Sequence, residues 1–403
     1  MIKKLLIALC LLLVVQAAVH KLSVKKLGSR SGALLKAGKP SEFRAYRQAH
    51  QRNYKAHLNR VKRGRKNSRA GRLASQPLYD YYDQAYTVAV GIGTPAQQFN
   101  LLLDTFLGDT WVPDATCDPT VCGCTDADDP SCTTRNTFDS SKSSTYKVDG
   151  RPFTDNNTQG TGFLGIDNIQ LGSDLTVTGV TFGQVDNPFQ YIKYYPFDGF
   201  LGLTFQSSDG VEPVIQAAVD QKLLDAPIFT LYLKSDGFDS AGQVGGQITY
   251  GSVDSDHCSS DVSYTPVLSQ NLWEFEVQST EIGGKTRKGN GWTAFADPSS
   301  TIIGLNNETL SDIVAATGAT FNTDYGLYQV DCNIQFQWTV TLGGSKFVVD
   351  QSNTLYNVGD FCLLMFESFV YPGIDFLLGG PFVQDYCLVY DVTGNLGFSK
   401  ITV

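Results

Sequence analysis

After its first residues, the 403-residue sequence has no apolar run long enough to cross a membrane. Its longest apolar run, Leu5–Val15, follows two lysines and is followed closely by the small residues Ala17 and Ala18. This order is typical of a secretory signal peptide. A membrane anchor is the alternative interpretation, but a transmembrane helix needs about 18 or more apolar residues. We therefore expect a signal peptide at residues 1–17 and no membrane anchor in the remaining chain.

Acidic residues are almost absent from the segment that follows. From Lys21 to Arg72 the chain holds 17 lysines and arginines and a single acid, Glu42, so its net charge is 17 − 1 = +16. Beyond this segment, 12 basic and 39 acidic residues give 12 − 39 = −27. A basic segment also suits a nucleic-acid-binding arm, which a secreted context disfavours. We expect residues 18–75, with an approximate boundary, to form a pro-segment that binds the acidic body by charge, and no nucleic-acid partner.

Histidine is also rare, with four residues in the chain, and none lies near the cysteine-rich stretch 117–132. Eight cysteines remain once Cys10 leaves with the signal peptide, and an even number in a secreted chain predicts disulfides. Half of them lie close together and predict a loop stapled by local bridges: Cys117, Cys122, Cys124 and Cys132. A zinc knuckle is the alternative, which the stretch CDPTVCGC fits poorly without a histidine.

Helical patterns are few beyond Gln76. Short runs rich in Val, Ile, Phe, Tyr and Thr alternate there with clusters of Gly, Asn, Asp and Ser, which is typical of strands and turns. Residues 211–224 and 308–319 are the best candidates for helices. The sequence therefore predicts an all-β body.

Two apolar runs of this body end on an aspartate. Asp104 follows three leucines, and Asp297 follows the run 293–296, so the two lie 297 − 104 = 193 residues apart, about one domain's length. An apolar unit that contains glycine comes after each aspartate, at 199–203 and at 376–380. Two half-chains that each offer one carboxylate predict a site at the junction of two lobes.

Several segments carry a resemblance to the pepsin family of aspartic endopeptidases. They lie at residues 86–113, 162–172, 198–203 and 375–401. The resemblance implies a bilobal, all-β, pepsin-like acid protease fold, with an active-site cleft between β-rich lobes at residues 76–255 and 256–403. It also implies the disulfides Cys332–Cys362 and Cys258–Cys387, and two local bridges within the cysteine quartet.

The same resemblance implies that Asp104 and Asp297 are the catalytic pair. Two carboxylates a few Å apart share one proton, because both cannot ionise cheaply. The ionised one takes a proton from a bound water, and the protonated one polarises the scissile carbonyl. The family needs no cofactor and no metal. The expected partners are a peptide or protein in the cleft and the chain's own pro-segment, and we expect a monomer.

Both catalytic loops depart from the family's D-T-G pattern, which is followed by Ser or Thr. They read Asp104-Thr105-Phe106-Leu107 and Asp297-Pro298-Ser299-Ser300. Phe106 replaces a glycine that lets the substrate approach closely, so we expect its ring either in the first primed subsite or turned into its own lobe. Pro298 has neither a hydroxyl nor an N–H for the bond that normally ties the loops together. Thr105 and Ser300 keep their hydroxyls for bonds to the other loop and to a carboxylate.

The flap that closes over substrate in the family lacks its tyrosine, since no Tyr occurs from residue 147 to 190. A gapless count places Asp155 at that position, and a two-residue shortening places Asn157 there. Trp111, the usual partner of the tyrosine, keeps an N–H that it can donate to Asp155.

Two sequons, at Asn156 near the flap tip and at Asn307, predict N-glycosylation. Each is either an occupied site or an unused tripeptide. A glycan at Asn156 would obstruct the cleft.

Two functions remain open on the sequence alone. The first is an aspartic endopeptidase, a hydrolase made as a zymogen, secreted or delivered to lysosomes, and active at acid pH, where protonation relieves repulsion among 39 acids. The second is a catalytically impaired relative that binds a ligand in the cleft or has a structural role on the same scaffold. The retained pair of acids favours the first function, and the altered loops and flap favour the second.

Overall fold

The computed structural model describes residues 74–81, 85–106, 109–124, 133–155, 158–189, 192–204, 210–234, 241–269, 272–298, 300–369 and 373–403. The predicted signal peptide and nearly all of the predicted pro-segment lie outside these residues. So do Leu107, Cys132, Asn156, Asn157 and Ser299. Within the described ranges, no helix is long and apolar enough to cross a membrane.

The first half of the described chain is built mainly of strands. These are β1 Ala74–Tyr81, β2 Tyr86–Ile92, β3 Gln97–Asp104, β4 Trp111–Pro113, β5 Lys147–Thr154, β6 Thr161–Leu171, β7 Leu175–Asn187, β8 Gly199–Gly202, β9 Ile228–Leu233 and β10 Ala241–Tyr250. The helical elements are α4 Pro119–Cys122, η1 Ser140–Lys142, η2 Ile192–Tyr194 and α5 Val214–Asp220.

The second half is also built mainly of strands. Its strands are β11 Cys258–Pro266, β12 Glu274–Ile282, β13 Lys285–Ala296, β14 Ile303–Leu305, β15 Thr320–Asn322, β16 Leu327–Val330, β17 Trp338–Leu342, β18 Ser345–Val349, β19 Leu355–Asn357, β20 Cys362–Leu364, β21 Phe366–Ser368, β22 Phe376–Leu378, β23 Tyr386–Asp391 and β24 Asn395–Ile401. Its helices are α6 Asn307–Thr317, α7 Gln351–Thr354 and α8 Gly380–Val383.

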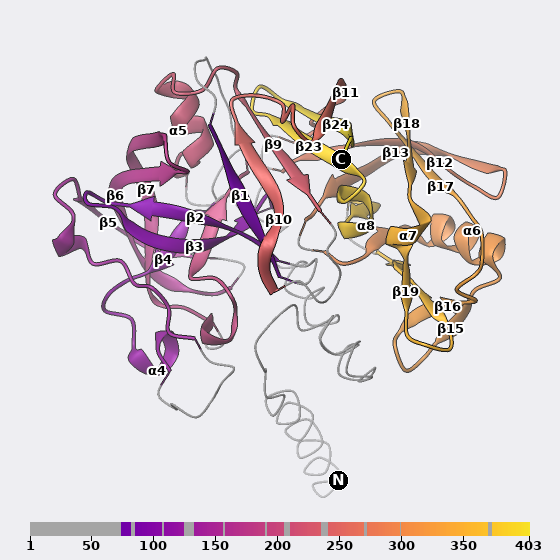
Figure 1. Ribbon diagram of the computed structural model, residues 1–403, viewed down its shortest axis with the longest axis horizontal. Coiled ribbons are helices and arrows are strands. Elements are labelled where there is room, and N and C mark those ends of the chain that lie inside the picture. The colour runs from indigo at the N-terminus through magenta and orange to yellow at the C-terminus, as the bar shows by residue number, and fades with distance from the viewer. Residues whose placement is uncertain are drawn as a thin grey trace, which may run out of the picture.

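One large sheet joins the two halves. Its strand order is β11-β24-β23-β9-β10-β1-β2-β3-β8-β4-β7-β6-β5, so β23 near the end of the chain pairs with β9 of the first half. Figure 1 shows the first half on the left, the second half on the right, and β9, β10, β23 and β24 above the space between them. The fold is therefore bilobal and mostly β, as the sequence predicted.

Strand β3 shows how the sequence sets the core. Phe99, Leu101 and Leu103 are buried at alternate positions of this strand and belong to the main core. Alternation with a period of two puts such residues on one face of a sheet. Leu102 points to the other face, where it packs against a second cluster that includes Trp111 and Phe200.

The two halves repeat one arrangement of four strands. In the first half, β3 runs parallel to β8, β8 runs antiparallel to β4, and β4 runs parallel to β7. In the second half, β13, β22, β14 and β21 make the same three pairings in the same order. Each predicted catalytic aspartate lies at the end of the first strand of its unit, so the weak repeat in the sequence reflects a repeat in the fold.

The two segments that favoured helices contain α5 and the greater part of α6. The Asn306 side chain caps α6 by accepting the backbone N–H of Thr309 at 2.9 Å. Gly318 ends the helix with a φ of 65°, a left-handed conformation that glycine adopts without strain.

Disulfides form where the resemblance implied them. Cys258 is bonded to Cys387 and Cys332 to Cys362. Within the cysteine quartet Cys117 is bonded to Cys122, and Cys124 is also in a disulfide. The Cys258–Cys387 bond joins residues 129 positions apart in the sequence and links β11 to β23 within the large sheet.

Candidate active site

Asp104 ends strand β3, where the parallel partner strand β8 fixes its backbone. It lies opposite Gly202, and its carbonyl accepts the N–H of Leu203 at 2.8 Å. The half-buried side chain accepts the N–H of Phe106 at 2.9 Å through Oδ1. This backbone donor fixes the orientation of the carboxylate within its own loop.

Asp297 follows strand β13 in the corresponding place of the second unit. Its N–H donates to the carbonyl of Leu378 in the parallel strand β22 at 3.0 Å, and its own carbonyl accepts the N–H of Ser300 at 3.2 Å. The residue is buried, with 4% of its surface exposed. The two aspartates therefore differ in burial and in backbone partners, although each is held against a parallel strand.

The buried side chain of Tyr390 lies close to both loops, although neither its hydroxyl nor that of Thr105 has a hydrogen-bond partner among the residues that the structure describes. Tyr390 lies in β23 with no exposed surface, stacks on Phe229 at 4.5 Å between ring centroids, and meets the edge of Trp273 at 4.8 Å. Burial raises the pKa of Tyr390, the Thr105 hydroxyl lowers it, and the charge of Asp297 raises it. Thr105 from one loop and Asp297 from the other thus act on the same buried phenol, which stays protonated.

The first loop also receives a bond from the second half of the chain. The indole N–H of Trp273 donates to the carbonyl of Leu203 at 2.9 Å, and both groups are buried. Leu203 is the residue whose N–H binds the carbonyl of Asp104. The segment that supports Asp104 is therefore fixed from both lobes.

Phe106 does not turn into its own lobe. Its ring, 8% exposed, packs in a cluster whose other members come from the second half of the chain: Leu272, Phe295, Phe369, Ile374 and Leu377. The ring centroids of Phe106 and Phe295 are 5.3 Å apart, at an interplanar angle of 32°. The replacement of glycine by phenylalanine therefore adds a contact between the lobes beside the catalytic loops.

In the second loop, the Ser300 hydroxyl makes a hydrogen bond within the loop itself. The Ser300 hydroxyl donates its single hydrogen to the carbonyl of Ile302 at 3.1 Å, and the Ser300 carbonyl accepts the N–H of Gly380 at 2.6 Å. The bond to a carboxylate, which the sequence left available, is therefore not the one that Ser300 makes. Pro298 is buried at the start of this loop.

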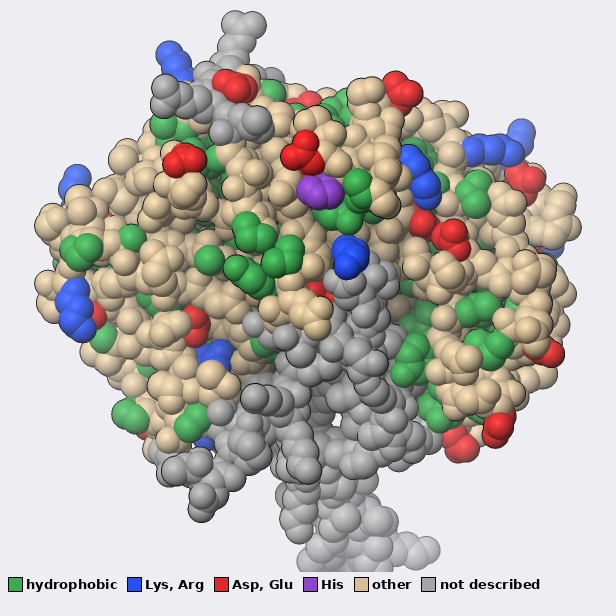
Figure 2. All heavy atoms as spheres, in the orientation of Figure 1, with side chains coloured by type: hydrophobic (Ala, Val, Ile, Leu, Met, Phe, Trp, Pro, Cys, Tyr) green, Lys and Arg blue, Asp and Glu red, His purple; other side chains and the backbone are tan. Residues whose placement is uncertain are grey.

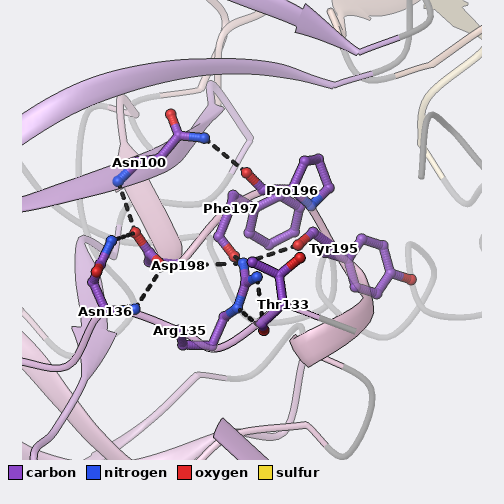
Figure 3. Close-up of polar contacts among 8 residues, drawn as sticks. All are labelled: Asn100, Thr133, Arg135, Asn136, Tyr195, Pro196, Phe197 and Asp198. Atoms are coloured by element: carbon purple, nitrogen blue, oxygen red, sulfur yellow. Dashed lines mark hydrogen bonds and ion pairs between the residues drawn. The ribbon is translucent and has the colours of Figure 1, made fainter. Parts of the chain in front are cut away.

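Asp198, in front of strand β8, organises a buried polar network that sequence reasoning missed (Figure 3). Its carboxylate accepts the N–H of Asn100 at 2.9 Å, and both the N–H and the side-chain amide of Asn136 at 2.9 Å. Asn100 lies in β3, so these bonds hold β8 in register against the strand that ends on Asp104. The available signal was an acid directly before the apolar run GFLGL.

Arg135 completes this network. It is 5% exposed and donates to the carbonyls of Thr133, Tyr195 and Phe197, and its Nη1 lies 4.0 Å from the carboxylate of Asp198. Arginine stays protonated at all relevant pH values, so Arg135 keeps its positive charge in acid and at neutrality. Local sequence gave no sign of this role, because the partners lie about 60 residues further along the chain.

The candidate flap residue Asp155 is fully buried beside Trp111. The indole N–H of Trp111 donates to Oδ2 of Asp155 at 3.2 Å, as the sequence suggested. Both the hydroxyl and the backbone N–H of Thr158 also donate to this oxygen. A carboxylate that accepts several hydrogen bonds therefore holds Trp111 and Thr158 together between β5 and β6.

Among the described residues, no group of three or more His, Cys, Asp or Glu side chains is arranged to hold a metal ion. Charged side chains of both signs are spread over both halves of the face drawn in Figure 2.

Two repeated strand units, each presenting one aspartate, define a two-lobed β-protein with one candidate carboxylate per lobe. A family model described as "Eukaryotic aspartyl protease" matches residues 85–401. Similar proteins include Aspartic protease 1 of Caenorhabditis elegans, 32% identical over 98% of this chain and 96% of the relative. Gastricsin of Macaca fuscata fuscata is 31% identical over 79% and 84%, and Pepsin A of Canis lupus familiaris is 29% identical over 80% and 82%. The chain belongs to the eukaryotic aspartyl proteases, a family of hydrolases.

Proposed function

We propose that the protein is an endopeptidase that cleaves peptide bonds at acid pH through Asp104 and Asp297. The observation that carries this proposal is the repeated strand unit. Asp104 at the end of β3 and Asp297 after β13 hold the same place against parallel strands β8 and β22. Both residues keep the one chemical group that the family's reaction needs.

In the proposed mechanism the two carboxylates hold one proton between them. The ionised group takes a proton from water, which attacks the scissile carbonyl, while the protonated group donates a hydrogen bond to the carbonyl oxygen. Asp104 accepts a backbone N–H from Phe106, and Asp297 is the more buried of the two groups.

The same proposal gives roles to the two segments at the start of the chain. Residues 1–17 direct secretion or delivery to lysosomes, and residues 18–75 act as a removable basic pro-segment. Ala74 and Ser75, at the end of that range, pair with Tyr250 and Thr249 in β10. Removal of the pro-segment up to residue 75 would therefore shorten β1. We expect the mature protein to act as a monomer on peptides or proteins.

Asn307 supports a glycosylation site on the second lobe. Its side chain is exposed at the first turn of α6, and the hydroxyl of Ser368 donates to its Oδ1 at 2.6 Å. The amide nitrogen, which would carry the glycan, takes no part in that bond. The other sequon, at Asn156, lies outside the described residues.

A second function, ligand binding without catalysis, is favoured by one observation. Phe106 packs on Phe295 from the other lobe, beside both loops, where the family has a glycine. Pro298 also favours the second function, because it lacks the hydroxyl that joins the two catalytic loops to each other in the family. Loss of positioning groups lowers a rate while leaving the fold intact.

The proposal is tested with mature protein, freed of its pro-segment, and an unstructured protein substrate between pH 3 and 6. We expect cleavage by the wild type and its loss in Asp297→Asn and in Asp104→Asn. Asp331→Asn, an exposed acid of the second lobe, is the matched control and should cleave like the wild type. Binding of a statine-type peptide without any cleavage would establish the second function instead.

A further inference from the structure

The repeated strand unit lets us compare the surroundings of Phe106 with the equivalent positions in the other lobe. Leu102 and Phe295 each precede a catalytic aspartate by two residues, and each points away from the main core. In the second lobe, Ala294 and Ala296 face the core while Phe295 faces the opposite side, as strand alternation requires. The side chains at these two positions therefore mark the same face of each lobe, next to its aspartate.

The first lobe covers this face with its own residues. Trp111, seven residues after Asp104, lies opposite Phe200 and packs against it with ring centroids 5.2 Å apart and the rings tilted by 34°. Leu102 packs against the same cluster. Nothing from the second half of the chain belongs to this cluster among the described residues.

The second lobe has no side chain at the corresponding place. Gly304, seven residues after Asp297, lies opposite Leu377. A Cβ at Gly304 would approach the Cβ of Phe369 to 2.8 Å and that of Leu377 to 3.1 Å, so no larger residue fits there without movement. The face is lined instead by Leu272, Phe295, Phe369, Ile374 and Leu377, which we call the second-lobe cluster, and Phe106 of the first lobe packs on it.

The position of the Phe106 ring relative to the carboxylates follows from its own bonds. Its N–H donates to Asp104 Oδ1 at 2.9 Å, and its ring centroid lies 5.3 Å from that of Phe295, two residues before Asp297. The ring thus connects the loop of Asp104 to the strand that leads into Asp297. A peptide whose scissile bond lies at those carboxylates would direct a neighbouring side chain to the space that this ring occupies.

We propose that Phe106 is a specificity-determining residue: its ring permanently occupies an apolar subsite on the second-lobe cluster, and a bound peptide must carry a small side chain at that position. The inference rests on the proposed endopeptidase function and names the kind of substrate it accepts. The chain selects peptides with glycine or alanine at one of the two positions that flank the scissile bond. Removal of the ring opens a hollow lined by aromatic and aliphatic residues, which favours phenylalanine or leucine there.

The test compares wild-type protein with Phe106→Ala and the milder Phe106→Leu. Each is given a peptide library randomised at both positions that flank the scissile bond. Each is also titrated by calorimetry with hydroxyl-isostere peptides that carry alanine or phenylalanine at either position. We expect Phe106→Ala to raise the preference for phenylalanine over alanine at one position by about tenfold or more, in cleavage and in binding. Phe106→Leu should give a smaller change in the same direction.

Phe347→Ala is the matched control. This buried ring lies in the main core, where it packs against Phe382, Tyr386 and Phe398. Its removal leaves a cavity of similar size away from the loops, so the variant should lose stability in thermal unfolding without a change of preference. An equal change of preference in the control would contradict the proposal.

The outcomes separate this inference from the proposed function. An altered binding preference in Phe106→Ala, without cleavage by any variant, upholds the occupied subsite and overturns the endopeptidase. Cleavage with the same preference at both positions in wild type, Phe106→Ala and Phe106→Leu upholds the endopeptidase and overturns the occupied subsite. Failure of every variant to bind any of the isostere peptides overturns the occupied subsite as well.

Discussion

The indole N–H of Trp111 donates to the carboxylate of Asp155 at 3.2 Å, with both residues fully buried. A carboxylate directly after β5 thus has Trp111 as its buried hydrogen-bond partner. The bond joins strand β4 to the turn that follows β5. The altered flap is therefore a specific structure with its own hydrogen bonds.

We predict that Asp155→Ala lowers the free energy of unfolding by about 1–3 kcal/mol, because the buried indole N–H loses its acceptor. Asp155→Asn keeps an acceptor oxygen of nearly the same shape and should cost less. Urea unfolding followed by tryptophan fluorescence measures both variants. Equal stability of Asp155→Ala and wild type would show that the bond is not important for the flap.

The buried network around Asp198 should affect both stability and turnover. Asp198→Ala leaves three N–H donors of Asn100 and Asn136 without their acceptor, beside the buried Arg135. Breaking a buried charged network in this way costs about 3–5 kcal/mol. Because the network holds β8 against β3, we expect kcat to fall more than KM rises.

Asp149→Ala is the control for Asp198→Ala. Asp149 pairs with Arg151, whose side chain is 55% exposed, at 2.7 Å. Exposed pairs of this kind contribute little to stability. A loss of stability in the control as large as in Asp198→Ala would contradict the role of burial.

Acid stability should depend on Asp312. The Arg287 guanidinium lowers the pKa of Asp312 below its ordinary value of 3.8, and Lys285 lowers it further, against an opposing effect of burial. Because the pKa in the folded state lies below that of the unfolded chain, this pairing stabilises the protein above about pH 4 and is lost as the pH falls through the folded pKa. Asp312→Asn should therefore lower Tm at pH 5 and change it little at pH 2.

The disulfide Cys258–Cys387 should contribute strongly to stability. Its two cysteines are 129 residues apart in the sequence, so the bond closes a long loop and restricts the unfolded chain. We predict that the double variant Cys258→Ser, Cys387→Ser loses about 2–5 kcal/mol of unfolding free energy. Differential scanning calorimetry under non-reducing conditions measures this, and an unchanged Tm would contradict it.

Local patterns in the sequence predicted the framework of this structure well. The alternation of apolar residues gave strands such as β3, and the runs that end on Asp104 and Asp297 gave the two candidate carboxylates. The segments 211–224 and 308–319 contain α5 and most of α6. These features depend on periodicity and turn chemistry within one segment, which is why a single sequence reveals them.

Contacts between distant segments were harder to predict. Arg135 and Asp198 lie close together although 63 residues of sequence separate them. The sequence around either residue gives no sign that the other is its partner. The direction of the Phe106 ring depends on a space in the second lobe, which Gly304 and its neighbours define. Sequence reasoning offered two directions for this ring but could not choose between them.

The pH dependence of kcat/KM between pH 2 and 7 tests most directly whether Asp104 and Asp297 act as one pair. The account predicts a bell-shaped profile for the mature wild-type protein, because only the pair with one proton is active. It also predicts no measurable cleavage by Asp104→Asn or Asp297→Asn at any of these pH values. A rate that rises steadily towards neutrality, or cleavage that survives either substitution, would contradict it.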